Sequence, residues 1–165
     1  MSATVPTLGL GQVGWVVENL EAAEAFFTRT IGVRKFLRFE NMRAGDVEGT
    51  YRGQPGDWVC RFSIGYAGDV QIEIVQHVSG PSVYADYLGD GGRSVQHVAY
   101  VLNEADYQSA AHRLESAGYA PLQTANTRIG KFGYFDTRGP IGVVTELIGL
   151  NDAGRALFQD LKSAG

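Results

Sequence analysis

The sequence predicts an α+β fold in which two β-α-β-β-β modules form one curved, cup-like, eight-stranded mixed sheet with helices on its outside. Two observations lead to this prediction. A strand-like segment leads into a helical pattern twice, at residues 12–17 and at residues 97–102. Each half later contains a strand-like segment with a central carboxylate, Glu73 and then Glu146. The offsets are 97 − 12 = 85 and 146 − 73 = 73, so the halves correspond if the first carries a longer loop, as in an internal repeat.

The first module is predicted to span residues 8–77. Its opening strand is followed by Asn19, a suitable N-cap, and by a helix that Gly32 would end. The predicted inward face of this helix consists of Leu20, Ala23, Phe26, Phe27 and Ile31. The polar, glycine-rich segment 41–57 is predicted to be a loop or an irregular hairpin. The predicted strands are residues 8–17, 33–39, 58–66 and 69–77.

The second module is predicted to span residues 94–150, after a linker at residues 78–93. Asn103 is predicted to cap its helix and Gly118 to end it. The inward face of this helix would hold Tyr107, Ala110, Ala111 and Leu114. The predicted strands are residues 94–102, 119–128, 131–136 and 141–150, and a C-terminal helical segment occupies residues 151–165. Together the modules form a single domain over residues 1–165, a size that suits one core.

Composition excludes several classes of function. The formal net charge of −4 argues against a nucleic-acid or anionic-membrane partner. Cys60 is the single cysteine, which rules out an intrachain disulfide and a cysteine-based zinc cluster. It is expected to be a small buried apolar residue and not a nucleophile. No apolar run approaches the ~20 residues of a membrane span, and residues 1–10 do not resemble a signal peptide. These features predict a cytoplasmic protein.

Strand alternation places four polar residues on one side of the predicted sheet. Gln12, His97, Glu73 and Glu146 each point away from the larger apolar set of their own strand. If those apolar sets pack under the helices, the four side chains face one shared concavity. A duplicated fold that brings Gln, His and two Glu together predicts a metal site.

The segments that carry these residues resemble the vicinal-oxygen-chelate superfamily. It includes glyoxalase I, methylmalonyl-CoA epimerase, extradiol dioxygenases and fosfomycin-resistance proteins, and the resemblance is closest to glyoxalase I and to epimerase-like members. In that superfamily, paired β-α-β-β-β modules form a curved sheet around a divalent metal. The resembling segments are residues 11–14 with 19–23, 71–76, 95–100, and 134–137 through 144–148.

The resemblance implies that Gln12, Glu73, His97 and Glu146 bind the metal. One imidazole nitrogen and three oxygens suit Zn, Ni, Co, Mn or Fe(II), because no thiolate selects zinc. The implied function is an isomerase, epimerase or lyase that transfers a proton on a small carbonyl substrate through a metal-bound enediolate. Glu146 and Glu73 are the predicted catalytic carboxylates. Such duplicated cups commonly pair, which predicts a homodimer.

Several alternatives remain open at this point. The epimerase resemblance implies a further carboxylate base before the Glu73 strand, and four residues are available: Glu40, Asp46, Glu48 and Asp57. The same cup without catalysis would be a hydrophobic-ligand or drug-binding protein of the resistance type. A ring-cleaving dioxygenase would use two histidines and one carboxylate, and only His97 sits at a matching position. Segments 41–57 and 78–93 are expected to set substrate choice.

Overall fold

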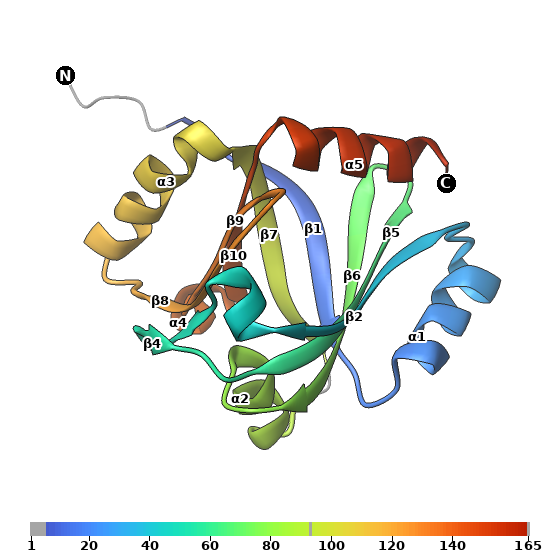
Figure 1. Cartoon of the computed structure of the whole chain (residues 1–165), viewed down its shortest axis with the longest axis horizontal. Helices are drawn as coiled ribbons and strands as arrows, with labels where there is room; N and C mark the ends of the chain where they lie inside the picture. Colours follow the sequence, from blue (N-terminus) through green and yellow to red (C-terminus); the bar gives the residue numbers. More distant parts are fainter. Residues whose placement is uncertain (1–5, 93, 165) are drawn as a thin grey trace.

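The computed structural model describes residues 6–92 and 94–164, so residue 93 of the predicted linker and residue 165 of the C-terminal segment lie outside it. Its strands are β1 (Gly9–Val16), β2 (Phe36–Arg43), β3 (Thr50–Tyr51), β4 (Gln54–Pro55), β5 (Val59–Ala67), β6 (Val70–Ser79), β7 (Val95–Asn103), β8 (Pro121–Thr127), β9 (Gly130–Phe135) and β10 (Val144–Leu150). They form one curved mixed sheet in the order β2-β5-β6-β1-β7-β10-β9-β8-β3-β4 (Figure 1). The predicted α+β class with a curved sheet is therefore confirmed.

The helices surround this sheet (Figure 1). They are α1 (Leu20–Phe26), the π-turn η1 (Phe27–Ile31), the 3₁₀ turn η2 (Ala44–Val47), α2 (Val83–Gly89), α3 (Glu104–Ser116), α4 (Arg138–Ile141) and α5 (Asp152–Ser163). None of the described helices is long and apolar enough to cross a membrane. The predicted linker 78–93 contains α2, whose Val83 and Tyr84 are buried.

The sheet has ten strands, so the prediction of eight was wrong. The two additional strands, β3 and β4, are two residues long and form a hairpin within segment 41–57. Thr50 and Tyr51 also pair with Thr124 and Gln123 of β8. This hairpin covers backbone groups of β8 that would otherwise form an open edge. Because it is short and polar, it carries no alternation signal in the sequence.

The two halves of the chain meet at the centre of the sheet, where β1 and β7 pair antiparallel. On either side lies a parallel pair, β1 with β6 and β7 with β10. The middle of the sheet therefore contains the two strand pairs that carry the repeated sequence pattern. The residue bounds of the two modules, 8–77 and 94–150, stay predictions.

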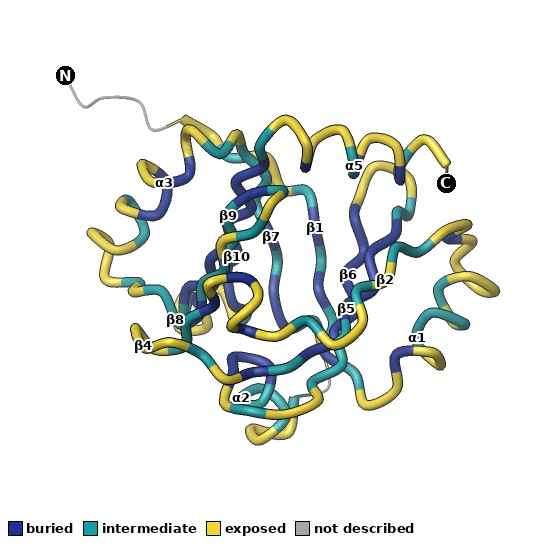
Figure 2. Tube along the Cα trace, in the orientation of Figure 1, coloured by how far each residue is buried: buried dark blue, intermediate teal, exposed yellow. Residues whose placement is uncertain are grey.

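The outer face of the sheet packs under the helices as predicted. Leu20 of α1 covers Ile72 and Ile74 of β6. Tyr107 of α3 packs in one cluster with Leu147 of β10. Figure 2 shows buried residues along the central strands and exposed ones on the outer sides of the helices. The four polar residues predicted for the metal site lie on the opposite, concave face.

Two predicted inward residues of the first helix are wrong, since Phe26 and Ile31 are each 52% exposed. Phe26 follows Leu20 by six residues, and at about 100° per residue it has turned away from the core. Ile31 lies in η1, where the π-turn changes the helical period. Helical spacing counted from Leu20 therefore does not predict which residues are buried at the C-terminal end of this helix.

The predicted helix ends are confirmed at three of four positions. Asn19 caps α1, because its side chain accepts a hydrogen bond of 2.8 Å from the Ala22 amide. Gly32 and Gly118 follow their helices with φ of 94° and 93°, which favours glycine. Asn103 occupies the N-cap position of α3 without capping it, because its Oδ1 accepts a hydrogen bond from Arg155 instead.

Candidate metal centre

Glu73 and His97 lie in one cross-strand row of the concave face, with a glycine between them. Gly14 on β1 is the register neighbour of Glu73 on β6 and also of His97 on β7. Adjacent strands lie about 4.8 Å apart, so the two functional side chains start two strands from each other. With no side chain on the middle strand, they reach toward one another above it.

Gln12 and Glu146 lie in the neighbouring row of the same face. Ala99 on β7 is the register neighbour of Gln12 on β1 and of Glu146 on β10. The middle position is again a small residue, and Ala99 is fully buried. Residues two apart on a strand share a face, so the two rows place all four polar side chains over the same patch of sheet.

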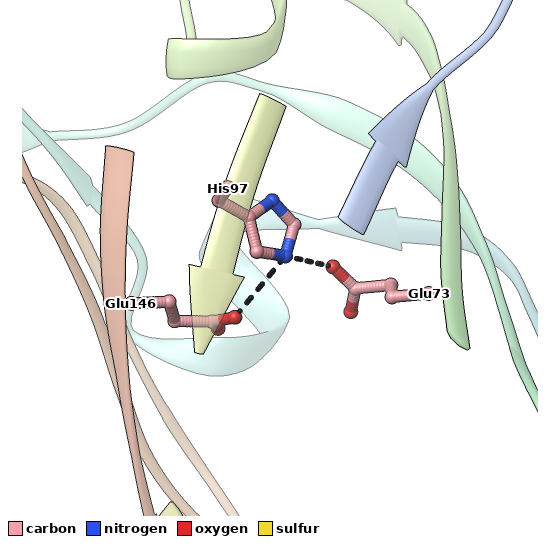
Figure 3. A group of neighbouring side chains, drawn as sticks. All are labelled: Glu73, His97 and Glu146. Atoms are coloured by element: carbon pink, nitrogen blue, oxygen red, sulfur yellow. Dashed lines mark ion pairs between the residues drawn. The ribbon is translucent and has the colours of Figure 1, made fainter. Parts of the chain in front are cut away.

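The carboxylates of Glu73 and Glu146 converge on the Nε2 atom of His97 (Figure 3), and the Gln12 side chain also reaches this atom. Nε2 lies 3.0 Å from Glu73 Oε2, 3.3 Å from Glu146 Oε2 and 3.2 Å from Gln12 Oε1. The donor atoms of Glu73, His97 and Glu146 all lie within 4.8 Å of one another. All four residues are buried, none being more than 6% exposed. The structure thus brings together every residue that the sequence singled out for this site.

Gln96 determines which nitrogen of His97 faces the cluster. Its Oε1 lies 2.6 Å from His97 Nδ1, and a carboxamide oxygen can only accept a hydrogen bond. Nδ1 therefore donates to Gln96, and Nε2 faces the oxygens of Gln12, Glu73 and Glu146. Histidines that bind metals typically donate their other ring N–H to a neighbouring acceptor, which fixes the orientation of the ring.

Gln71 similarly orients Gln12. The amide nitrogen of Gln12 donates to Gln71 Oε1 at 2.6 Å, and Gln71 Nε2 donates in turn to the Tyr66 hydroxyl at 3.0 Å. Since its nitrogen is engaged, Gln12 turns its oxygen toward the cluster. The sequence pattern did not mark Gln71 or Gln96 as part of the site, because each acts through a hydrogen bond to Gln12 or His97.

This donor set fits a divalent cation. Three buried side-chain polar atoms of the described residues lack a hydrogen-bond partner, and two of them are Glu73 Oε2 and Glu146 Oε2. The third is the indole nitrogen of Trp58. Buried carboxylate oxygens without a hydrogen-bond partner are costly unless a cation joins them. Donors about 2.1 Å from an ion are spaced by about 3.0–3.4 Å along octahedral or tetrahedral edges, which matches the three distances from His97 Nε2 to the surrounding oxygens.

Glu146 carries the clearest electrostatic perturbation of the cluster. Burial raises the pKa of its carboxyl well above the usual range, and the nearby charge of Glu73 raises it further. Hydrogen bonding from Tyr134 partly opposes this effect. Two carboxylates in one dry site therefore disfavour each other's charge, and a cation between them would relieve that repulsion.

A cavity of about 300 Å³ opens above the cluster, with Glu73 and Glu146 in its wall. Most of the other lining side chains are apolar and include Phe39, Met42, Trp58, Phe62, Ile64 and Phe132. Pockets of this size and lining are typical of small-molecule sites.

Tyr84 and Tyr134 close the cavity beside the cluster. The Tyr84 hydroxyl donates to the Tyr134 hydroxyl at 2.8 Å, and the Tyr134 ring meets His97 edge-on at 5.4 Å. Burial raises the pKa of both phenols well above 10, so both remain protonated donors. Tyr84 comes from α2 in the segment predicted as a linker, where no local pattern marks it as functional.

Of the four carboxylates available before the Glu73 strand, Asp46 of η2 is the one that lines the cavity. Glu40 binds Arg61 at 2.6 Å, and Glu48 accepts a hydrogen bond from Asn126 at 2.7 Å. Asp46 enters the cavity from η2, whereas Glu73 and Glu146 enter from the sheet. The sequence left these carboxylates undistinguished because only the path of segment 41–57 separates them.

Cys60 takes no part in this site. It is fully buried in the core, and burial raises the pKa of its thiol to about 12. The thiolate needed for nucleophilic chemistry is therefore not formed near neutral pH. The expectation of a small buried residue is confirmed.

Fold and site together define a class of protein: a curved mixed sheet built around a buried His/Glu/Glu cluster on the two central strand pairs. Residues 11–135 match the family model described as the Glyoxalase/Bleomycin resistance protein/Dioxygenase superfamily. The chain belongs to this superfamily, so the resemblance noted from the sequence is confirmed. A search of curated protein sequences gave no match.

Solved structures share this fold at low sequence identity. Methylmalonyl-CoA epimerase from Mycobacterium tuberculosis is 18% identical with a TM-score of 0.64, over 93% of this chain and 97% of that one. A hypothetical protein from Bacillus halodurans C-125 is 15% identical with a TM-score of 0.65, over 89% and 97%. A mutant 4-hydroxymandelate synthase from Streptomyces coelicolor is 17% identical with a TM-score of 0.57, over 91% and 43%.

Proposed function

We propose that this protein is a divalent-metal-dependent enzyme that transfers a proton at a carbon next to a carbonyl group, as an isomerase, epimerase or lyase. The observation that carries the proposal is the pair of buried, unpartnered carboxylate oxygens of Glu73 and Glu146, both beside the His97 Nε2 atom and both in a cavity wall. Structural neighbours named as methylmalonyl-CoA epimerases support the same reaction class.

Gln12, Glu73, His97 and Glu146 would hold the ion, and Zn, Ni, Co, Mn or Fe(II) would suit these donors. When bound, such an ion supplies Lewis-acid chemistry that acidifies a C–H bond beside a carbonyl. The protein's own part is to aim the donors: Gln96 fixes the imidazole of His97, and Gln71 fixes the amide of Gln12.

Carboxylates in the cavity wall would move the proton. Glu146, whose carboxyl pKa is raised by burial, is suited to take a proton from carbon and return it. Glu73 would serve in the same role from β6, which β1 and β7 separate from the β10 strand of Glu146. Asp46 gives a further carboxylate from η2, and a glyoxalase-like or epimerase-like reaction could use such a group on the other side of the substrate. The apolar walls exclude water, which strengthens these electrostatic interactions.

Proton exchange tests the chemistry directly. We expect metal-loaded protein in D₂O to exchange the α-protons of a carbonyl substrate, followed by proton NMR, and protein treated with EDTA to lose this activity. Glu146→Gln should lower the exchange rate by about 10²-fold or more, in line with the loss of a general base. Asp46→Asn should also lower it, with Glu48→Gln as the matched control. Full exchange in both Glu146→Gln and Asp46→Asn would refute the assigned proton carriers.

Metal content tests the site. Protein purified without chelator should contain near-stoichiometric Zn, Ni, Co, Mn or Fe by elemental mass spectrometry, and His97→Ala should lose it. If neither protein contains metal and none is taken up on addition, the metal-dependent proposal fails.

The apolar lining of the cavity also favours a second candidate, a non-catalytic protein that binds a hydrophobic or drug-like ligand. Glu146→Gln separates the two functions. Loss of turnover with retained ligand affinity supports the enzyme, whereas unchanged behaviour in every assay supports the binding protein. Oxygen uptake with Fe(II) and a catechol would instead support the dioxygenase alternative. Of the two histidines that such an enzyme would use, this chain has only His97 at a matching position.

We also propose that the protein forms a homodimer. Light scattering should then give a mass of 2 × 17.8 = 35.6 kDa. A clean monomer at 17.8 kDa would contradict this.

A further inference from the structure

The charges around the cavity limit the substrate that it can accept. We propose that the substrate is a compact carbonyl compound that carries an aromatic or branched hydrocarbon group and no more than one negative charge, which pairs with Arg128. This inference rests on the proposed function and specifies its substrate class. It excludes carriers that bring several anionic groups, such as coenzyme A thioesters and glutathione adducts.

Apolar side chains face the substrate on most sides of the cavity. Phe39 and Met42 come from β2, Phe62 and Ile64 from β5, and Phe132 from β9. Removing apolar surface from water is the main favourable term that such walls offer to a ligand. A substrate made only of polar groups would lose its hydration here without gaining partners. The lining therefore selects a hydrocarbon group next to the reacting carbonyl.

The charged groups in the wall are few. Glu73 and Glu146 belong to the metal centre, and Asp46 adds a third carboxylate. Among the described residues that line the cavity, Arg128 is the one cation, and it is exposed. One guanidinium can pair with one carboxylate of a ligand. With a divalent cation on Glu73 and Glu146 the wall carries no net charge, and beyond Arg128 it offers no cationic side chain to a ligand with several phosphates or carboxylates.

Nearby arginines do not supply the missing positive charge. Arg38 and Arg61 form ion pairs with Glu24 and Glu21 of α1, and Arg61 also binds Glu40 of β2. Arg52 binds Asp86 of α2 at 3.1 Å. These guanidinium groups are therefore engaged in ion pairs within the protein and do not line the cavity.

The size of the cavity agrees with a compact ligand. Its volume of about 300 Å³ lies at the lower end of the range of about 300–1,000 Å³ that is typical of ligand pockets. Helix α5 runs across one end of the cup, in contact with β5 and β10, and contributes Phe158 to the wall (Figure 1). Val47 of η2 contributes a further apolar side chain. One aromatic ring with a short side chain fills such a space.

Calorimetric titration of metal-loaded protein with five probes tests the proposal. Phenylpyruvate carries a ring, a ketone and one carboxylate, and 1-phenyl-1,2-propanedione carries the ring without the charge. Pyruvate lacks the ring, and methylmalonyl-CoA and S-lactoylglutathione represent the highly charged carriers. We expect both aromatic probes to bind at least tenfold more tightly than pyruvate and than either carrier. Equal or tighter binding of pyruvate or a carrier, or no binding of the aromatic probes, would overturn the proposal.

A charge variant tests the role of Arg128. Arg128→Gln should weaken phenylpyruvate binding about fivefold or more and leave 1-phenyl-1,2-propanedione unchanged. The matched control is Arg34→Gln, at an exposed arginine outside the cavity, which should change neither. An equal effect of Arg128→Gln on both aromatic probes would overturn the pairing.

Deuterium exchange separates this inference from the proposed function. Exchange of a carrier substrate without binding of the aromatic probes would refute the substrate class and keep the enzyme. Binding of the aromatic probes without exchange at any carbonyl compound would keep the ligand class and refute proton transfer.

Discussion

Gly14 lies directly beneath the imidazole ring of His97. The two are register partners on β1 and β7, and a Cβ atom placed on Gly14 would overlap the ring. Glu73 is the register neighbour of Gly14 on its other side, so the glycine provides the space across which His97 and Glu73 approach to 3.0 Å. The cluster therefore depends on a residue that contributes no donor atom.

Gly14→Ala should displace His97 and disrupt the metal centre. We expect a loss of about 1–3 kcal/mol in the free energy of unfolding, as for other overpacked cores, together with a large loss of metal affinity. Urea unfolding and a competitive metal titration measure the two effects. Gly139→Ala is the matched control, because a Cβ there meets nothing within 4 Å. Wild-type metal affinity in Gly14→Ala would refute the steric argument.

Gln96→Leu should weaken metal binding without removing a donor. The variant loses the acceptor that holds the proton on His97 Nδ1, and such second-layer changes typically cost about 10–100-fold in affinity. Gln96→Glu, which keeps an acceptor at this position, should retain most of the metal affinity. Gln76→Leu, on the same sheet but hydrogen-bonded to Arg61, should have no effect. If Gln96→Leu binds metal normally, Gln96 does not position His97.

Removing one carboxylate should stabilise the protein when metal is absent. Glu146→Gln eliminates the cost of burying a second acidic group beside Glu73, so we expect EDTA-treated protein to gain about 1–3 kcal/mol. Added metal should stabilise the wild type more than the variant, because binding to the folded state adds to its stability. Differential scanning calorimetry with and without metal gives both values. A Glu146→Gln variant less stable than the wild type in EDTA would contradict this account. The control is Glu48→Gln, at an exposed carboxylate, which should leave the stability unchanged.

Acid should destabilise the fold through the ion pairs on α1. The hydrogen bond from Arg61 lowers the pKa of Glu21 to about 2, and Arg61 also lowers the pKa of Glu40. A lowered carboxyl pKa stabilises the folded state above the unfolded value of about 4.5, and this stabilisation is lost as the pH falls toward 2. We expect the free energy of unfolding to decline over that window.

Arg61→Gln should flatten this decline, as measured by urea unfolding at pH 2–6. Salt should weaken the same effect, because the carboxylates of Glu21 and Glu40 are about half exposed and therefore screened. Arg34→Gln, at an exposed site outside the network, should retain the wild-type pH profile. An unchanged profile in Arg61→Gln would show that other carboxylates account for acid sensitivity.

The sequence by itself determined the repeated strand and helix pattern and the identity of the four converging residues. Alternation is a local property, so it fixed which face of each strand carries Gln12, Glu73, His97 and Glu146. The sequence also determined where the two main helices end, because a glycine follows each of them and a left-handed backbone favours glycine wherever it occurs.

Only the tertiary structure decided what surrounds those four residues. Gln71 and Tyr84 enter the site through contacts between elements distant in sequence, and no local pattern encodes such contacts. Gln96 is next to His97 in the chain, but its side-chain hydrogen bond to the imidazole is seen only in the structure. The choice of Asp46 over Glu40, Glu48 and Asp57 depends on the path of segment 41–57, whose short hairpin pairs with β8. The cup's charge and volume likewise arise from side chains of many elements. Local spacing fixes the direction of a side chain, whereas its neighbours depend on how the whole chain packs.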